Sequence, residues 1–407
     1  MNRREFHWML GAAAAGLPAS AAESKITGVS RGRLDLIAPR DTPPGETWHY
    51  QIALPFQVTP VLAAIFCNVR KGFAPGGDFE TGNDVVLFDD PLRVRAESAV
   101  VLSRNQEEAN PHDGGKRGVL VKYPSRGGFI PVGCRRADGS PHPCAGTGFA
   151  INQALAWPLQ SSRQYSGAQT YQFFELQQLA FDGKTIRISS HSRVGMNELV
   201  DGWLIHDGGL TNAIPDGDDL IVGMTGGRPA GSGGANDPNR VSGGAGMMRW
   251  KRRGDRWMPV SFVPVTGQEH SFEPSLIRDV DGSLLFSARG TQEGLKHAIR
   301  VWRSADGGNT WKEIIHVRNA IASTPVSLNQ AADGTPYVAA NLYEVLMRKI
   351  APEFRPKPDA EGRVRGAGWQ REKLSLWPLN PERNGLEVPI IARDTVAEFG
   401  LPPHGST

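Results

Sequence analysis

The chain has 407 residues, with 45 Lys or Arg against 42 Asp or Glu, so its formal net charge at pH 7 is only +3. This near-neutral balance gives no reason to expect a nucleic acid or another polyanion as the partner. The 48 Gly and 30 Pro residues make up about a fifth of the chain, which favours a turn-rich β protein over a helical one.

The first residues, MNRREFHWMLGAAAAGLPASAAESK, have the layout of a secretory signal. Arg3 and Arg4 form a charged start, a short apolar run follows, and Ala-Ser-Ala suits cleavage by a signal peptidase. The apolar run is too short to cross a bilayer as a stable helix. The paired arginines followed by Phe6 resemble a twin-arginine signal, which exports folded proteins. We therefore expect residues 1–22 to be a signal peptide and the protein to be periplasmic or secreted.

Outside this start the chain has no apolar run long enough to cross a membrane, and VLAAIF at positions 61–66 fits a buried strand. Cys134 and Cys144 flank the turn-rich stretch RRADGSPHP. Two cysteines that close such a loop in an exported chain usually pair, so we expect a disulfide between them. Cys67 is expected to be a buried thiol. His142 does not complete a zinc site with the pair, because the compact ligand spacings are missing, and no metal or cofactor is expected.

A recurring phrase runs along the chain: an apolar segment, an Asp-Gly turn and a second apolar segment, which is the signature of a β-hairpin. The turns are Asp182-Gly183, Asp216-Gly217, Asp281-Gly282 and Asp333-Gly334. The last two turns begin 52 residues apart, which suits one four-stranded unit per repeat. The glycine-rich stretch from Gly226 to Gly246 is either a loop over a binding face or an insertion without a role.

Two further segments are charged. RWKRRGDRW, residues 249–257, mixes basic and aromatic residues as nucleic-acid binders do. Its Gly254-Asp255 turn between alternating strands instead favours a solvated hairpin, so no nucleic acid is expected as a partner. Residues 349–369 carry many charges and three prolines and are interpreted as a long surface loop.

The segment SADGGNTW, residues 304–311, follows one apolar strand and leads into another. Its Asp can accept hydrogen bonds from backbone N–H groups of its own turn, and its glycines can adopt positive φ angles. Its Trp can pack beneath the strand that follows. The segment resembles the Asp-box, or BNR repeat, of the sialidase superfamily. The matching residues are Ser304, Asp306, Gly308, Thr310 and Trp311.

The resemblance implies a fold. In the sialidase superfamily the Asp-box lies on the hairpin between the two outer strands of a propeller blade, away from the active site. We therefore expect residues 23–407 to form one all-β domain, a β-propeller closed by pairing between strands from the two chain ends. At ~55 to 65 residues a blade, the ~385 mature residues predict about six four-stranded blades, with five or seven also possible.

The resemblance extends upstream to FEPSLIRDVDGSLLFSARG. This segment is similar to one in bacterial sialidases in which a Glu begins a strand and an Arg ends the next. Glu273 and Arg289 stand 16 residues apart, and a strand–turn–strand unit would bring both to the same end of a blade. The resemblance implies that Glu273 activates a nucleophilic tyrosine and that Arg289 grips a substrate carboxylate. The alternative is a structural salt bridge.

The remaining members of such a site stay open. The chain has no Arg-Ile-Pro triplet, which usually carries the family's first substrate-binding arginine, and Pro325 occupies the place expected for the tyrosine. We take Tyr343 as the candidate nucleophile, with Tyr337 as the alternative. We take Arg240 as a further substrate-binding residue, and the other candidates for that role are Arg193 and Arg348.

These patterns predict a secreted carbohydrate-active protein, a sialidase-like exo-glycosidase that acts on a terminal or acidic sugar. One alternative is a polysaccharide lyase, for which His270 beside Glu273 would offer a base; otherwise His270 would contact the substrate. Another is a propeller that binds a glycan or a protein without catalysis, because the fold hosts all three. The expected partner is a glycan or oligosaccharide, and the protein is expected to be a monomer.

Overall fold

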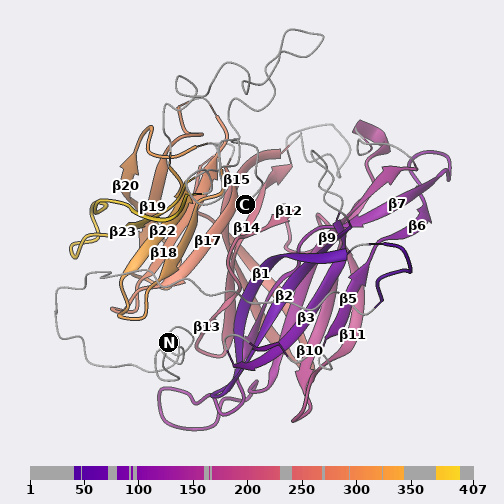
Figure 1. Cartoon of the computed structure of the whole chain (residues 1–407), viewed down its shortest axis with the longest axis horizontal. Helices are drawn as coiled ribbons and strands as arrows, with labels where there is room; N and C mark the ends of the chain where they lie inside the picture. The colour runs from indigo at the N-terminus through magenta and orange to yellow at the C-terminus, as the bar shows by residue number, and fades with distance from the viewer. Residues whose placement is uncertain are drawn as a thin grey trace.

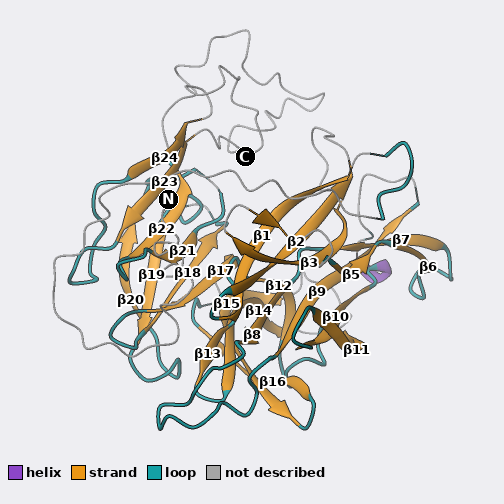
Figure 2. Cartoon of the chain, turned by 60° about the horizontal axis from the view of Figure 1, so that its bottom comes forward, coloured by secondary structure: helices purple, strands orange, loops and turns teal. Residues whose placement is uncertain are grey.

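The computed structural model describes residues 41–46, 48–71, 80–90, 93–94, 99–159, 165, 167–229, 241–267, 271–292, 294–322, 324–342 and 373–394. Within these residues the regular secondary structure is all β-strand except for a 3-10 turn at Gly167–Gln169 (Figure 2). No helix in this part of the chain is long and apolar enough to span a bilayer. The expected signal peptide lies outside the described residues.

The strands form five antiparallel sheets in chain order, and these sheets are the blades of a β-propeller. Blade 1 contains β1 (Trp48–Thr59), β2 (Leu62–Lys71), β3 (Glu80–Asp90), β4 (Arg93–Val94) and β5 (Val100–Arg104). Blade 2 contains β6 (Gln106–Ala109), β7 (Arg117–Lys122), β8 (Arg126–Ile130), β9 (Thr147–Pro158), β10 (Gln172–Phe181) and β11 (Ile186–Gly195). Blade 3 contains β12 (Leu204–Gly208), β13 (Ile214–Asp216), β14 (Asp219–Pro229), β15 (Val241–Arg253) and β16 (Arg256–Pro264).

The last two blades are simple four-stranded meanders. Blade 4 contains β17 (Ser271–Arg278), β18 (Leu284–Gly290), β19 (Ile299–Ser304) and β20 (Lys312–Val317). Blade 5 contains β21 (Ser327–Gln330), β22 (Pro336–Asn341), β23 (Lys373–Pro378) and β24 (Ile390–Asp394). In Figure 1 blade 3 lies between blades 1 and 2 on one side and blades 4 and 5 on the other.

The hydrophobic core lies in layers between successive blades. Alternate residues of each strand point to opposite faces, so each inner sheet can pack on both neighbours. One cluster of buried residues joins each successive pair of blades from blade 1 to blade 5. Between blades 2 and 3, Phe149 stacks on Trp250 with ring centroids 3.9 Å apart, and both side chains are fully buried. Such a stack adds about 1 kcal/mol beyond the buried area.

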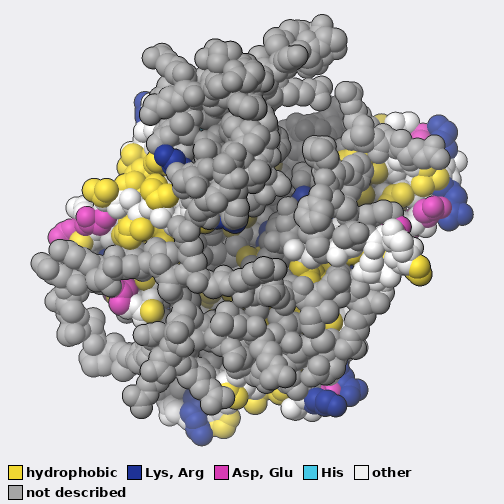
Figure 3. Space-filling view, viewed as in Figure 1, with side chains coloured by type: hydrophobic (Ala, Val, Ile, Leu, Met, Phe, Trp, Pro, Cys, Tyr) yellow, Lys and Arg dark blue, Asp and Glu magenta, His cyan; other side chains and the backbone are white. Residues whose placement is uncertain are grey.

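The surface is mixed in charge. On the face seen in Figure 3, acidic and basic side chains lie close to one another at the outer edges of the described blades. This mixture agrees with the net charge of only +3. The described side chains of this face therefore form no large field of a single sign.

The described residues form five blades, which is within the expected range of five to seven and one fewer than the central expectation of six. The main reason for the smaller number is blade 2, which runs from Gln106 to Gly195. The strand before β9 is interrupted, because β7 and β8 both pair with β9, and a hairpin follows β8 before β9 begins. Each described sheet contains strands from one continuous part of the chain, and the two chain ends, whose strands were expected to pair, lie outside the described residues.

The structure lacks the expected disulfide, because Cys134 and Cys144 are both free cysteines. The hairpin that follows β8 explains this. His142 donates its backbone N–H to the carbonyl oxygen of Cys134 at 2.9 Å, and Arg135 pairs with Pro141. His142 therefore lies opposite Cys134, and Cys144 lies beyond it. Both cysteines pack against the cluster between blades 2 and 3, and burial raises the pKa of each thiol.

The SADGGNTW segment forms the turn between β19 and β20, the two outer strands of blade 4. Asp306 Oδ1 accepts the backbone N–H of Thr310 at 2.9 Å, and Oδ2 accepts its hydroxyl at 2.7 Å. Ser304 Oγ donates to Asp306 Oδ1 at 2.7 Å and accepts the Gly308 N–H at 2.8 Å. Trp311 packs edge-on against Phe286. These contacts close the turn and anchor it to the blade.

Candidate functional site

Glu273 lies near the start of β17, where the pairing with β18 is irregular. Phe272 is opposite Arg289 and Ser275 is opposite Ser287, so two residues of β17 face one residue of β18. This is a β-bulge, a local feature that re-aims side chains. The backbone of Glu273 has a φ of 51°, in the left-handed region that non-glycine residues rarely adopt.

The bulge brings Glu273 and Arg289 together. Glu273 Oε2 accepts a hydrogen bond from Arg289 Nη1 at 3.0 Å, and about a quarter of each side chain remains exposed. In a regular antiparallel pair, successive side chains alternate between faces, and Glu273 would point away from the face of Phe272 and Arg289. The extra residue breaks this alternation. The expected proximity of the two side chains is therefore realised through a bulge rather than through regular strands.

The pair lies at the end of blade 4 opposite the SADGGNTW turn. β17 runs from this end to the Asp281-Gly282 turn, β18 returns, and β19 runs down again to the turn of Asp306. A carboxylate beside a guanidinium can accept a proton from a hydroxyl group, and the guanidinium can bind a second anionic group through its planar fork. The arrangement therefore suits recognition and chemistry of a carboxylate-bearing ligand.

Several expected site residues cannot be compared with this pair. The residues outside the described part of the chain are Arg240, His270, Tyr343 and Arg348. Leu342, which precedes Tyr343, forms an isolated bridge with Ile321. His297, on the connection after β18, has its Nδ1 3.0 Å from the carbonyl oxygen of Ile321. The end of β22 therefore lies beside the end of blade 4 that carries Arg289.

The structure places two alternative candidates away from the pair. Tyr337 lies at the start of β22, next to the Asp333-Gly334 turn and thus at the other end of its blade. Burial raises the pKa of its hydroxyl. Arg193 lies on β11, the outer strand of blade 2, with its Nη1 2.9 Å from Glu108. Neither residue is brought to Glu273.

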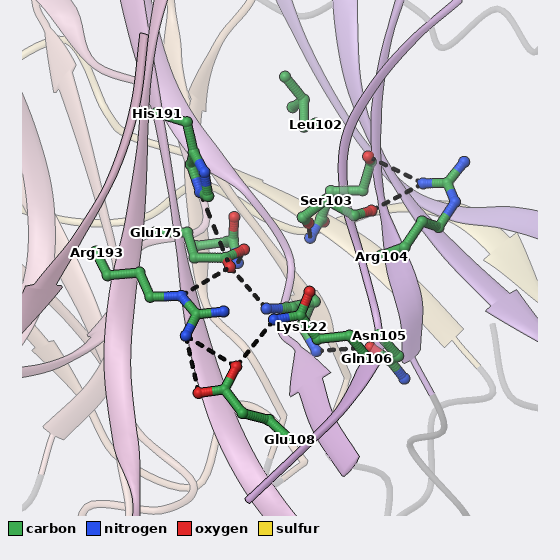
Figure 4. A network of polar contacts seen from close by, with 12 residues as sticks. Leu102, Ser103, Arg104, Asn105, Gln106, Glu108, Lys122, Glu175, His191 and Arg193 are labelled. Carbon is green, nitrogen blue, oxygen red and sulfur yellow. Dashed lines mark hydrogen bonds and ion pairs between the residues drawn. The ribbon is translucent and has the colours of Figure 1, made fainter.

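Sequence reasoning missed a buried polar network in blade 2 (Figure 4). Lys122 Nζ lies 2.7 Å from Glu175 Oε1, and the two side chains are only 1% and 4% exposed. Figure 4 shows His191 and Arg193 directed toward Glu175, with closest ion-pair distances of 3.8 and 4.0 Å. Burial lowers the pKa of Lys122. Lys122 and Glu175 are too deeply buried to meet a substrate, so we interpret this network as structural.

A second missed cluster lies in blade 1. Tyr50 donates its hydroxyl to Asp84 at 2.9 Å, and Arg104 Nη1 lies 2.6 Å from the same carboxyl group. Tyr50 packs against the cluster around Cys67, on the face of blade 1 opposite the layer shared with blade 2. Burial raises the pKa of both Tyr50 and Asp84. In this structure the Tyr50 hydroxyl serves as a hydrogen-bond donor to Asp84.

Among the described residues, no group of three or more His, Cys, Asp or Glu side chains is arranged to hold a metal ion. His142, Cys134 and Cys144 thus form no such group. His142 Nδ1 accepts the backbone N–H of Cys144 at 3.1 Å, and its Nε2 lies 2.9 Å from the carbonyl oxygen of Gly217. Both ring nitrogens are thus engaged by the backbone.

No protein-family model matches the sequence. No curated protein matches it either. Solved structures with a similar chain path include a Trypanosoma rangeli sialidase, with 14% identity, a TM-score of 0.47, and coverage of 81% of this chain and 46% of that one. A leech intramolecular trans-sialidase has 11% identity, a TM-score of 0.49, and coverage of 90% and 64%. A protein of unknown function from Dyadobacter fermentans has 12% identity, a TM-score of 0.48, and coverage of 87% and 85%. The chain therefore spans less than half the length of the trypanosomal enzyme.

Proposed function

We propose that the protein is a sialidase-like exo-glycosidase that removes a terminal sugar bearing a carboxylate. The observation that carries this proposal is the Glu273–Arg289 pair, held on a strained bulge at one end of blade 4. Backbone strain of this kind persists at functional sites, because it aims a side chain that the chemistry needs. The Asp-box turn at the other end of the same blade supports the sialidase-type placement.

In this proposal Arg289 binds the carboxylate of the sugar, because a planar guanidinium offers two parallel N–H donors to a carboxylate. Glu273 accepts the phenol proton of the attacking tyrosine, for which Tyr343 is the candidate. The tyrosine oxygen would bond to the anomeric carbon as the glycosidic bond breaks, and the aglycone oxygen would leave with a proton from water. Water would then replace the tyrosine on the sugar, and the phenol would recover its proton from Glu273, as in the sialidase exception to two-carboxylate glycosidases. The export signal would deliver the enzyme to glycans outside the cytoplasm.

The test is a hydrolysis assay on aryl glycosides of a sialic acid and of neutral sugars. Glu273→Gln keeps the shape of the side chain but removes the base, so kcat should fall ~10²-fold or more with the fold intact. Arg289→Lys keeps the charge but loses the fork, so KM should rise for the acidic sugar and stay unchanged for any neutral sugar that is cleaved.

Glu313→Gln is the matched control. Glu313 also binds an arginine of blade 4, with Arg300 Nε 3.1 Å from its Oε2, but it lies on the outer strand β20. Its replacement should leave kcat unchanged. An unsaturated product that absorbs in the ultraviolet would instead identify a lyase, and glycan binding without turnover would identify a binding protein. Equal losses in the Glu273 and Glu313 variants would mean that Glu273 is structural.

A further inference from the structure

The left-handed backbone of Glu273 differs from the other cases in the described residues. Three non-glycine residues there have positive φ angles: Glu273, Asn319 and Arg383. Asn319 and Arg383 lie in turns, where such angles are tolerated. Glu273 lies within the bounds of a strand, directly before a proline, and a following proline favours extended backbone instead. Glu273 therefore departs both from the negative φ that non-glycine residues favour and from the extended backbone that a following proline favours.

Blade 3 holds the residue after Glu273. Leu210 donates its backbone N–H to the carbonyl oxygen of Pro274 at 2.6 Å. A Cβ atom at Gly209 would lie 2.5 Å from that same oxygen, and a Cβ atom at Gly223 would lie 3.2 Å from the proline ring. The proline is thus seated on two glycines: a side chain at Gly209 would clash with its carbonyl oxygen, and one at Gly223 would press against its ring. Gly209 and Leu210 lie in the interruption between β12 and β13, which leaves Leu210 able to donate to blade 4.

Blade 5 holds the next residue. Ser275 is fully buried, and its Oγ accepts the backbone N–H of Leu328 at 2.7 Å and donates to the carbonyl oxygen of Val326 at 3.2 Å. Thr211, on the blade 3 side, accepts the N–H of Leu276 through its Oγ1 at 3.0 Å. Residues 274–276 are therefore fixed between both neighbouring blades. On the other side, Phe272 is paired with β18. Glu273 is the single residue that joins these two fixed parts of the chain, and its left-handed backbone makes the connection.

We propose that Gly209, Leu210 and Gly223 are positioning residues that hold Glu273 in its left-handed conformation and so direct its carboxylate toward Arg289. Without this contact, Glu273 would relax to an extended backbone and its side chain would turn to the other face of β17. The catalytic consequence rests on the proposed function. The conformational consequence does not, because it concerns only the fold and the direction of one side chain.

The first arm of the test measures stability and needs no substrate. Glu273→Gly and Glu273→Ala both remove the carboxylate, but only glycine adopts a positive φ without cost. If Glu273 is held in a strained state, the glycine variant should have a folding equilibrium constant about fivefold or more above that of the alanine variant. Equal stability of the two variants, measured by chemical denaturation, would overturn the proposal.

The second arm measures turnover in Gly223→Ala, whose new methyl group would push against the Pro274 ring. We expect kcat per folded molecule to fall at least tenfold while KM changes little, because Arg289 still binds the sugar. Gly246→Ala is the control: its Cβ would lie 2.4 Å from the carbonyl oxygen of Val263, within blade 3 and away from Pro274. It should lose stability but keep its kcat.

The outcomes separate the two proposals. If Glu273→Gln abolishes activity but Gly223→Ala and Gly246→Ala have the same kcat as the wild type, the positioning role is overturned and the proposed function stands. If the wild type cleaves no glycoside but Glu273→Gly is still more stable than Glu273→Ala, the proposed function fails and the strained conformation of Glu273 is supported.

Discussion

Two carboxylates of blade 4 show how environment separates structural from chemical roles at the scale of single residues. Asp306 accepts three hydrogen bonds from its own turn, and the bonds from Thr310 and Ser304 hold its pKa well below the usual range. Both of its oxygens serve the turn. Glu273 has an arginine partner, remains partly exposed, and sits on a strained backbone. Both carboxylates are open to solvent, but that of Asp306 is held within its own turn, whereas that of Glu273 lies beside a guanidinium that can bind an anionic ligand.

Asp306→Ala should therefore lower stability and leave kcat per folded molecule unchanged. Because the folded-state pKa of Asp306 is depressed, its contribution is present above the unfolded value of 3.8 and is lost as pH falls through the folded value. The difference in unfolding free energy between wild type and variant should be full at pH 7 and shrink below about pH 4. A difference that stays constant down to pH 2 would contradict this assignment.

The resemblance to bacterial sialidases singled out Glu273 and Arg289, and their closeness was predictable because a single hairpin separates them. The left-handed φ was not readable, because it depends on Leu210 and Gly223 in another blade. Cys67 is the buried thiol that was expected, whereas the free state of Cys134 and Cys144 was missed. The hairpin register there places His142 opposite Cys134, and spacing alone does not reveal register.

At the scale of elements, buried ion pairs fix how the strands of a blade pack. Lys122 on β7 and Glu175 on β10 belong to strands that do not pair directly, since β9 runs between them. Their side chains meet over the sheet with almost no exposure to water. A buried carboxylate left without its cation is strongly destabilising, whereas an apolar pair of similar volume is tolerated.

Lys122→Met should destabilise the fold by about 3 to 5 kcal/mol, and adding Glu175→Leu should restore much of that loss. The matched control is Arg117→Met, on the same strand, because the Arg117–Glu107 pair is exposed and such pairs are worth under about 1 kcal/mol. Denaturant titrations of Lys122→Met, Glu175→Leu, the double variant, Arg117→Met and the wild type would measure these differences. Additive losses in the double variant would show that the two side chains are not coupled.

Hairpins were predictable at this scale, whereas contacts between distant strands were not. The Asp281-Gly282 and Asp333-Gly334 turns join β17 to β18 and β21 to β22, and Gly282 and Gly334 have φ angles of 86° and 88°. Their turn chemistry is local. Lys122 and Glu175 are 53 residues apart and carry no pattern that links them.

At the scale of the whole molecule, the β-propeller was predicted from the resemblance to the Asp-box and from the repeated hairpins, and the five blades of the described residues lie within the expected range of five to seven. Dividing length by a typical blade overestimates the number where insertions lengthen a blade, as in blade 2, which runs from Gln106 to Gly195 and in which the strand before β9 is split. The strand before β14 in blade 3 is split as well, into β12 and β13. The split in blade 3 is also the place from which Leu210 reaches Pro274. The same interruption therefore makes blade 3 irregular and provides the contact that holds Pro274, the residue after Glu273.

The most direct test of the account is a crystal structure of the Glu273→Gln variant with a bound sialic acid glycoside. If Glu273 and Arg289 form the active site, the carboxylate of the sugar should lie within hydrogen-bond distance of the Arg289 guanidinium. Residue 273 should keep its positive φ beside the reacting end of the sugar. A sugar bound elsewhere on the propeller, or bound with its carboxylate away from Arg289, would contradict the claim that this pair forms the active site.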